Sequence, residues 1–170
     1  VIDAAKGIEP RTLKLFEVCR LRDIPIVTFV NKMDREARDT FEILDEIEQK
    51  LALDTAPITW PIGQGKSFSG TYHLAENAVR RSDEEAERTK VNGPDSNRVA
   101  GLLPDNERPD FIEALELARE ACRPFDLAAF REGHLTPVFF GSALRNYGVR
   151  DLIEALGAWG PMPRAQEADR

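Results

Sequence analysis

The stretch Ile26-Val27-Thr28-Phe29-Val30-Asn31-Lys32-Met33-Asp34 decides the fold. Residues 26–30 are all β-branched or aromatic and show no polar alternation, which is typical of a parallel strand covered on both faces. The strand runs directly into the polar residues 31–34, so a loop leaves its carboxyl end. Open α/β sheets bind ligands at this edge, and the stretch therefore predicts a parallel sheet with a ligand-binding loop.

Helices and strands alternate around this stretch. Upstream, Val1-Ile2 is typical of the end of a strand, and Pro10 opens a helix. Downstream, Asp39 and Glu42 form a capping box for a second helix. The apolar stripes of the two helices consist of Leu13, Phe16 and Cys19 with Leu15 and Val18 beside them, and of Phe41, Leu44, Ile47 and Leu51. The order strand, helix, strand, helix predicts an α/β fold.

The same rhythm returns near the end of the chain. Residues 137–140 predict a short buried strand that runs into Gly141-Ser142-Ala143-Leu144. A helix ending at Gly160-Pro161 follows. Its apolar stripe is expected to contain Val149, Leu152, Ile153, Leu156 and Trp159. We therefore expect this chain to contain the last three strands of a doubly wound parallel sheet.

Residues 56–134 interrupt the alternation, although connections in α/β sheets usually take about 2–6 residues. Within them, residues 57–63 and 67–74 indicate two short strands around a glycine turn. Residues 83–90 are highly charged and predict a solvated hairpin or loop. Pro109 opens a helix with Phe111, Leu115, Ala118 and Cys122 on one face, and residues 125–131 indicate another short helix. We predict an inserted α+β subdomain.

The loop 31–34 has the residues needed to recognise a guanine base. A carboxylate at Asp34 can accept hydrogen bonds from both N1 and N2 of guanine, which an adenine edge cannot offer. The Asn31 amide can bond N7 and tie this loop to its neighbours. The aliphatic stem of Lys32 can lie along the base with its ammonium outward. A polar site that the wrong base leaves unpaired discriminates strongly.

The loop 141–144 predicts the second half of the same site. Small residues let the backbone N–H of Ala143 approach O6 of guanine, and the Ser142 hydroxyl can brace the Asp34 carboxylate. Either loop alone is a weak signal. Together they follow two parallel strands at one sheet edge, so we predict a guanine site formed by Asn31, Lys32, Met33, Asp34, Ser142, Ala143 and Leu144.

The sequence Gly63-Gln64-Gly65-Lys66-Ser67 resembles the end of a phosphate-binding loop. The full pattern requires a glycine at position 60, where Trp60 stands, and a helix should follow. Strand-like residues follow instead, so we predict a hairpin turn with Lys66 facing solvent, away from Asn31 and Ser142. No GxxxxGK[ST] pattern and no DxxG loop for magnesium and the γ-phosphate occurs in the chain.

Composition excludes several classes of function. The net charge of −7 argues against a direct nucleic-acid site or an anionic membrane surface. No apolar run is long enough to span a bilayer. Cys19, Cys122, His73 and His134 are isolated in sequence, so we expect reduced thiols and no metal site. The chain opens within a strand and without an initiator methionine, and we expect it to be a fragment of a longer protein.

With the two loops placed, the chain resembles the G domain of translational GTPases, and within that family the peptide chain release factor 3 branch. The resemblance covers the whole chain. It is carried by residues 1–7, 31–35, 56–63, 68–74 and 136–144. Elongation factor G is similar at several of these places, but Thr59-Trp60 and Tyr72-His73-Leu74 are closer to the release factors.

This resemblance implies that residues 1–55 and 135–163 are the C-terminal half of a GTPase G domain, 56–134 its inserted subdomain and 164–170 a linker. It implies GTP or GDP as ligand and a cytoplasmic factor that works on the ribosome. Its activity would be the GTP-dependent release of class I release factors in translation termination. The Mg²⁺ ligands are expected outside these residues, so the chain alone should not hydrolyse GTP. The alternatives are a translocation GTPase similar to elongation factor G, and a catalytically silent interaction module.

Overall fold

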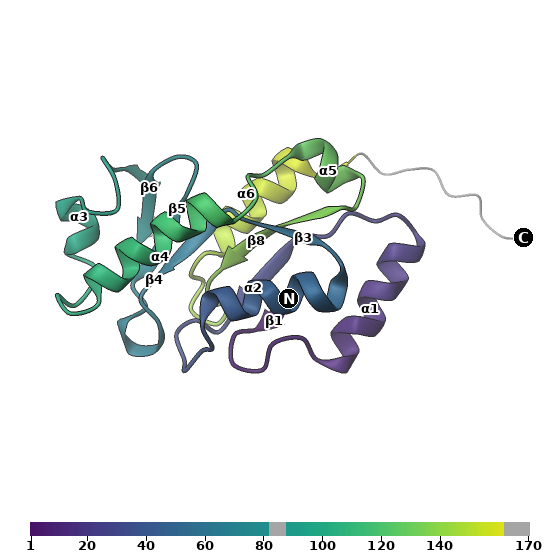
Figure 1. The fold of residues 1–170 in the computed structure, drawn as a ribbon, viewed down its shortest axis with the longest axis horizontal. Coiled ribbons are helices and arrows are strands. Elements are labelled where there is room, and N and C mark those ends of the chain that lie inside the picture. Colours follow the sequence, from purple (N-terminus) through teal and green to yellow (C-terminus); the bar gives the residue numbers. More distant parts are fainter. Residues whose placement is uncertain (82–87, 162–170) are drawn as a thin grey trace, which may run out of the picture.

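The computed structural model describes residues 1–81 and 88–161 and confirms an α/β fold (Figure 1). A parallel sheet has the strand order β1-β2-β8-β3. Its strands are β1 (Ile2–Asp3), β2 (Thr28–Asn31), β8 (Leu135–Phe140) and β3 (Asp54–Pro57). The helices connected to it are α1 (Pro10–Leu21), α2 (Thr40–Leu51) and α6 (Val149–Trp159). Helix α2 begins after Asp39 as expected, and the Asp39 carboxylate accepts hydrogen bonds from the backbone N–H groups of Phe41 and Glu42. The expected capping box is only half formed, because the Glu42 carboxylate lies 3.7 Å from Arg38 Nε instead.

The parallel sheet has one strand more than the three expected. The additional strand β3 pairs with β8 from Asp54 opposite Leu135 to Pro57 opposite Val138. It therefore crosses the expected boundary between residues 55 and 56. A single strand was expected over 57–63, but the chain leaves this sheet at Ile58 and enters a second one at Thr59. The strand order also places β2 beside β8, so the two base-reading loops leave adjacent strands.

The two faces of the parallel sheet pack against different helices. Along β2, Val30 belongs to the core that contains Ile43 and Ile47 of α2, whereas Phe29 packs with Ala155 of α6. Successive residues of a strand point to opposite faces, so a sheet covered on both sides needs an unbroken apolar run. This explains why residues 26–30 lack polar alternation.

The residues expected to form the insertion build a separate antiparallel sheet with the order β4-β5-β6-β7. Its strands are β4 (Thr59–Ile62), β5 (Gly70–His73), β6 (Ala78–Arg81) and β7 (Thr89–Lys90). The short 3₁₀ helix η1 (Gly65–Ser67) forms the turn between β4 and β5. Three helices follow, α3 (Asn97–Ala100), α4 (Arg108–Ala121) and α5 (Leu127–Arg131). The glycine turn and both expected helices are confirmed. Of the charged segment 83–90, residues 83–87 lie outside the described residues.

Trp60 joins the two sheets into one core. Its indole is 3% exposed and lies 5.0 Å from the ring of Phe41 on α2 and 5.9 Å from that of Phe140 on β8, between ring centroids. Buried residues of the insertion, among them Tyr72 and Leu115, belong to the same continuous cluster. The antiparallel sheet is therefore packed onto the parallel sheet and shares its hydrophobic stabilisation.

Two predicted apolar stripes differ from the structure. On α6, the expected stripe included Ile153 and Leu156, which are exposed, whereas Asp151 and Ala155 are buried. On α1 no residue is fully buried, and Leu15 and Val18 are exposed. The predicted stop of α6 is confirmed, since the helix ends at Trp159. Residues 162–163 and the expected linker 164–170 lie outside the described residues.

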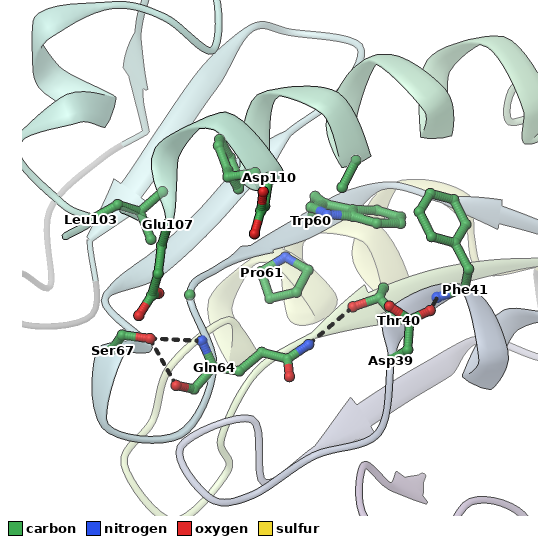
Figure 2. Close-up of a pocket in the computed structure, with 13 residues that line it drawn as sticks. Asp39, Thr40, Phe41, Trp60, Pro61, Gln64, Ser67, Leu103, Glu107 and Asp110 are labelled. Atoms are coloured by element: carbon green, nitrogen blue, oxygen red, sulfur yellow. Dashed lines mark hydrogen bonds between the residues drawn. The ribbon is translucent and has the colours of Figure 1, made fainter. Parts of the chain in front are cut away.

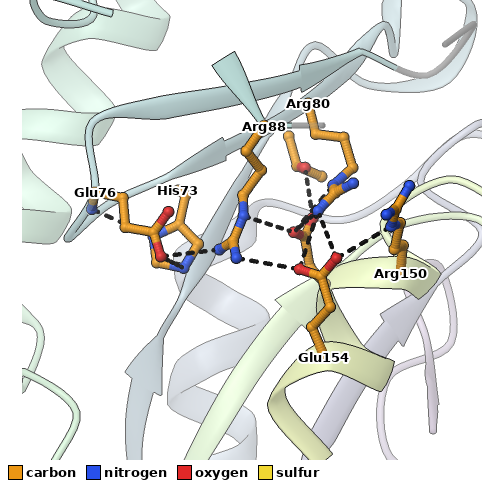
Figure 3. Close-up of polar contacts among 8 residues, drawn as sticks. His73, Glu76, Arg80, Arg88, Arg150 and Glu154 are labelled. Carbon is orange, nitrogen blue, oxygen red and sulfur yellow. Dashed lines mark hydrogen bonds and ion pairs between the residues drawn. The ribbon is translucent and has the colours of Figure 1, made fainter. Parts of the chain in front are cut away.

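A cluster of charged residues connects the antiparallel sheet to α6 (Figure 3). Arg80 on β6 contacts Asp151 at 3.0 Å and Glu154 at 3.1 Å. Arg88, just before β7, contacts Glu154 at 3.1 Å, and the Thr71 hydroxyl donates to Asp151 at 3.4 Å. The side chains of Arg80 and Asp151 are only 7% and 1% exposed. This pairing explains why α6 turns Asp151 towards the sheets and leaves Ile153 in solvent.

His73 lies beside this cluster, and burial lowers the pKa of its imidazole below the ordinary value. Its Nδ1 accepts a hydrogen bond from the backbone N–H of Glu76 at 3.3 Å, which favours the neutral ring. The unfolded state therefore binds the proton more readily than the folded state. Stability conferred by the neutral ring should be present above pH ~6.5 and be lost as pH falls towards the lower folded pKa.

We accordingly expect the free energy of unfolding to fall between pH 7.5 and pH 5.5. His73→Gln should make this pH dependence shallower, and the slope should change by less than ~1.4 kcal/mol per pH unit. Urea denaturation of the purified protein at several pH values measures it. His134→Gln is the matched control, because the His134 side chain is 73% exposed, whereas that of His73 is 11% exposed. Equal slopes in the wild type and the His73 variant would contradict the expectation.

Candidate guanine-nucleotide site

The structure brings the two predicted loops into direct contact at the carboxyl ends of β2 and β8. Asn31 Oδ1 accepts hydrogen bonds from the backbone N–H groups of Lys32 and Ala143, both at 2.8 Å. The backbone N–H of Met33 donates to the carbonyl of Gly141 at 3.1 Å. Oδ1 takes both backbone donors, and the Asn31 NH₂ group has no hydrogen-bond partner among the described residues, so its N–H groups remain available for a ligand. The expectation that Asn31 ties neighbouring loops together is confirmed.

The Ala143 contact changes one expected role. Its backbone N–H was expected to approach O6 of guanine, but in the structure this N–H donates to Asn31. Gly141 lets the chain after β8 pack closely against Tyr147 and β2, because a Cβ at this position would overlap the carbonyl oxygen of Tyr147 and the ring of Phe29. Leu144, the last predicted site residue, is 82% exposed beside this contact.

Lys32 is held by a residue that the sequence analysis did not include in the site. Its ammonium lies 2.6 Å from Asp3 Oδ2, at the end of β1. This hydrogen bond is the largest cause that lowers the pKa of Asp3, and the backbone N–H groups of Ala5 and Lys6 add to it. The Lys32 backbone has φ of 71°, in the left-handed region. Such backbone conformations in non-glycine residues cluster at functional sites.

Asp34 contacts Arg145 and not Ser142. Its Oδ2 lies 3.2 Å from Arg145 Nε, and its side chain is only 7% exposed. The Ser142 hydroxyl, expected to brace this carboxylate, is buried and has no hydrogen-bond partner among the residues that the structure describes. The expected contact between Ser142 and Asp34 is therefore replaced by an ion pair with a residue further along the same loop.

The turn of the insertion that resembles a phosphate loop is a hairpin turn, as predicted, and Lys66 is exposed. Its backbone nevertheless touches the first base-reading loop, since the Gly65 N–H donates to the carbonyl of Met33 at 2.8 Å. The ring centroid of Phe68 lies 6.0 Å from that of Tyr147, in the second loop. The predicted exposure of Lys66 is confirmed, and the Gly65 contact shows that the turn lies beside the first base-reading loop.

A pocket of about 400 Å³ lies between this turn, the start of α2 and α4 (Figure 2). The Ser67 hydroxyl donates to the carbonyl of Gln64 and accepts from its N–H, which closes the turn on itself. Among the lining residues, Asp39, Glu107 and Asp110 are acidic and none is basic. Three carboxylates repel phosphate groups, so this pocket is unsuited to the phosphates of a nucleotide.

Asp3 and Arg145 were not among the predicted site residues. Asp3 belongs to the segment 1–7, which carried part of the resemblance, and it follows the apolar residues of a predicted strand. This position could have indicated that Asp3 belongs to the site. No pattern marked Arg145, because its partner is 111 positions away and only the adjacency of β2 and β8 brings the two together. Within residues 1–81 and 88–161, no group of three or more His, Cys, Asp or Glu could hold a metal ion.

Comparison with known families agrees with this arrangement. A model of the family described as "Elongation factor Tu GTP binding domain" matches residues 1–161. The chain belongs to this family. Membership of the elongation factor Tu GTP-binding domain family implies GTP or GDP as ligand and a translational GTPase as the class of protein. No helix of the described ranges is both long and apolar enough to cross a membrane.

Individual relatives of the GTP-binding domain narrow the comparison. The chain is 48% identical over 172 aligned positions to a protein named "Peptide chain release factor 3" from Aromatoleum aromaticum. That alignment covers 99% of this chain and 31% of the relative, so the chain spans about a third of the relative's length. A crystal structure of a Thermus thermophilus protein has a TM-score of 0.67 and 23% identity, covering 95% of this chain and 26% of that one. This second likeness shows the fold alone.

Proposed function

We propose that the loops 31–34 and 141–144 recognise the guanine base of GTP or GDP. The observation that carries this proposal is the hydrogen bond from Ala143 N–H to Asn31 Oδ1, at 2.8 Å. It fixes the Asn31 amide with its NH₂ group available for N7 of the base. Asp34 would supply two carboxylate oxygens for N1 and N2. The aliphatic stem of Lys32, whose ammonium lies 2.6 Å from Asp3 Oδ2, would support the base.

The chain's residues would act by binding and orienting the base. A bidentate carboxylate pairs with a two-donor edge and leaves an adenine edge unpaired, which is the strongest form of discrimination open to a polar site. The phosphates and Mg²⁺, whose sequence patterns are absent from these residues, would be held by groups outside them. Phosphoryl transfer depends on those groups. We therefore propose base recognition, and not hydrolysis, for this chain.

We propose further that the protein acts on the ribosome, in the cytoplasm, in GTP-dependent recycling of class I release factors. The support is the 48% identity to a protein named peptide chain release factor 3. The net charge of −7 favours docking on protein over ribosomal RNA for these residues, because phosphate contacts need clustered Lys and Arg. The surfaces that select the ribosomal state would lie on the insertion or beyond the described residues.

The test uses the protein at its natural full length and purified ribosomes that have released their peptide and still hold a class I release factor. The protein with GTP should accelerate departure of that factor and leave a pretranslocation complex unmoved. Departure is followed by the fluorescence of a labelled factor. Translocation without factor release would assign the protein to the branch of elongation factor G. Neither activity, despite binding to the ribosome, would favour a silent interaction module.

A further inference from the structure

Arg145 covers the carboxylate proposed to read the base. Its Nε lies 3.2 Å from Asp34 Oδ2, and its side chain is 56% exposed, whereas that of Asp34 is 7% exposed. Among the described residues, the Asp34 side chain has no other ion pair or hydrogen bond. The buried carboxylate therefore has a solvent-accessible cation as its partner, and a base that uses both oxygens of Asp34 has to displace or share this contact.

The number of hydrogen-bond donors on the base decides how strongly the contact between Arg145 and Asp34 opposes binding of that base. Guanine presents N1–H and N2–H, which together need both oxygens of Asp34. Hypoxanthine, the base of inosine nucleotides, lacks the amino group and presents N1–H alone. It can use the oxygen that Arg145 does not contact. A guanidinium bound to one oxygen of the carboxylate thus weakens binding of a base with two donors more than binding of a base with one donor.

We propose that Arg145 competes with the guanine N2 amino group for Asp34 and so sets how strongly the site distinguishes guanine from hypoxanthine. This inference rests on the proposed recognition of guanine by the two loops. Arg145 acts on specificity through Asp34 and has no catalytic role. The Ser142 hydroxyl does not take over the carboxylate in this arrangement, since it has no hydrogen-bond partner in the described part of the chain.

The expected effect has an unusual sign. Removing a positive charge from a nucleotide site ordinarily weakens binding of the negatively charged ligand. Arg145→Ala should instead tighten GDP binding, by about two- to fivefold, which is the value of a partly exposed ion pair. Binding of inosine diphosphate should stay the same. Higher salt screens the ion pair of Arg145 and Asp34 in the wild type, so the difference in GDP affinity between the wild type and the variant should become smaller.

The experiment titrates GDP and inosine diphosphate, by calorimetry at low and high salt, into the protein at its natural full length. The variants are Arg145→Ala and Arg145→Lys, the second of which keeps a cation and should give an intermediate GDP affinity. Arg123→Ala is the matched control. Arg123 Nε also lies 3.2 Å from an aspartate, Asp54 Oδ2, with its side chain 67% exposed, at the start of β3 and so at the opposite edge of the sheet.

The proposal is supported if Arg145→Ala binds GDP more tightly, binds inosine diphosphate as the wild type does, and Arg123→Ala shows no such gain. Unchanged or weaker GDP binding in Arg145→Ala would overturn it, as would an equal gain for both nucleotides. The wild type separates these results from the proposed function. If it does not prefer GDP over ADP, recognition of guanine by these loops is itself wrong, and the role of Arg145 falls with it.

Discussion

Asp34→Asn should weaken binding of guanine nucleotides by about 1–3 kcal/mol, or roughly 5- to 150-fold, and improve binding of xanthine nucleotides. The carboxylate accepts from both N1 and N2 of guanine, whereas an asparagine amide has one acceptor and one donor group. Facing guanine, its NH₂ would meet another donor. Xanthine carries a carbonyl in place of the amino group, so that the same NH₂ has a partner. Competition between GDP and xanthosine diphosphate for the protein at its natural full length measures the change.

Asp39→Asn is the matched control for this substitution. Asp39 caps α2 through its side chain, and asparagine caps helices about as well, so the preference for guanine should not change. Unaltered GDP affinity in Asp34→Asn would remove Asp34 from the site. Equal losses in both variants would indicate a general effect of the substitution on the fold.

The second large effect is expected at the charged cluster between α6 and the antiparallel sheet. Asp151→Ala should destabilise the fold by about 3–5 kcal/mol, because it takes from the buried guanidinium of Arg80 a carboxylate that is itself buried and lies 3.0 Å away. Glu154, 3.1 Å from Arg80, remains and limits the loss. The change in free energy of unfolding is measured by urea denaturation. Arg80→Met combined with Asp151→Leu should recover part of this loss, since a buried ion pair replaced by apolar residues leaves no unpaired charge.

Asp105→Ala provides the comparison. Asp105 is also paired with an arginine, Arg108, at 2.7 Å, but its side chain is 90% exposed. The pair is shorter than that of Arg80 and Asp151, yet removing it should cost less than ~1 kcal/mol. Comparable losses from both substitutions would show that burial does not set the strength of the cluster.

The ligand edge of the sheet could be predicted because its signals are local. An unbroken apolar strand, residues 26–30, runs into Asn31, and a second one runs into Gly141. Both loops therefore had to leave the carboxyl ends of parallel strands. Strand β3 could not be predicted in the same way. Its residues, Asp54–Pro57, include no long apolar side chain, and its partner β8 begins only at Leu135.

Side-chain roles depended on contacts that sequence periodicity does not contain. Helix α6 has apolar residues on most of its surface, so its pattern did not reveal which side faces the sheet. The pairing of Asp151 with Arg80 decides that orientation, and Ile153 is left exposed. Likewise the pairing of Asp34 with Arg145, and not with Ser142, follows from the path of the loop after β8.

The central claim is that two loops of this chain read guanine, and a crystal structure of the full-length protein with GDP tests it most directly. The predicted result places N1 and N2 of the base within hydrogen-bond distance of the Asp34 carboxylate, with N7 facing the Asn31 amide. Arg145 should no longer contact Asp34. A base bound elsewhere, with the hydrogen bond between Asn31 and Ala143 intact and Asp34 still paired with Arg145, would contradict the claim.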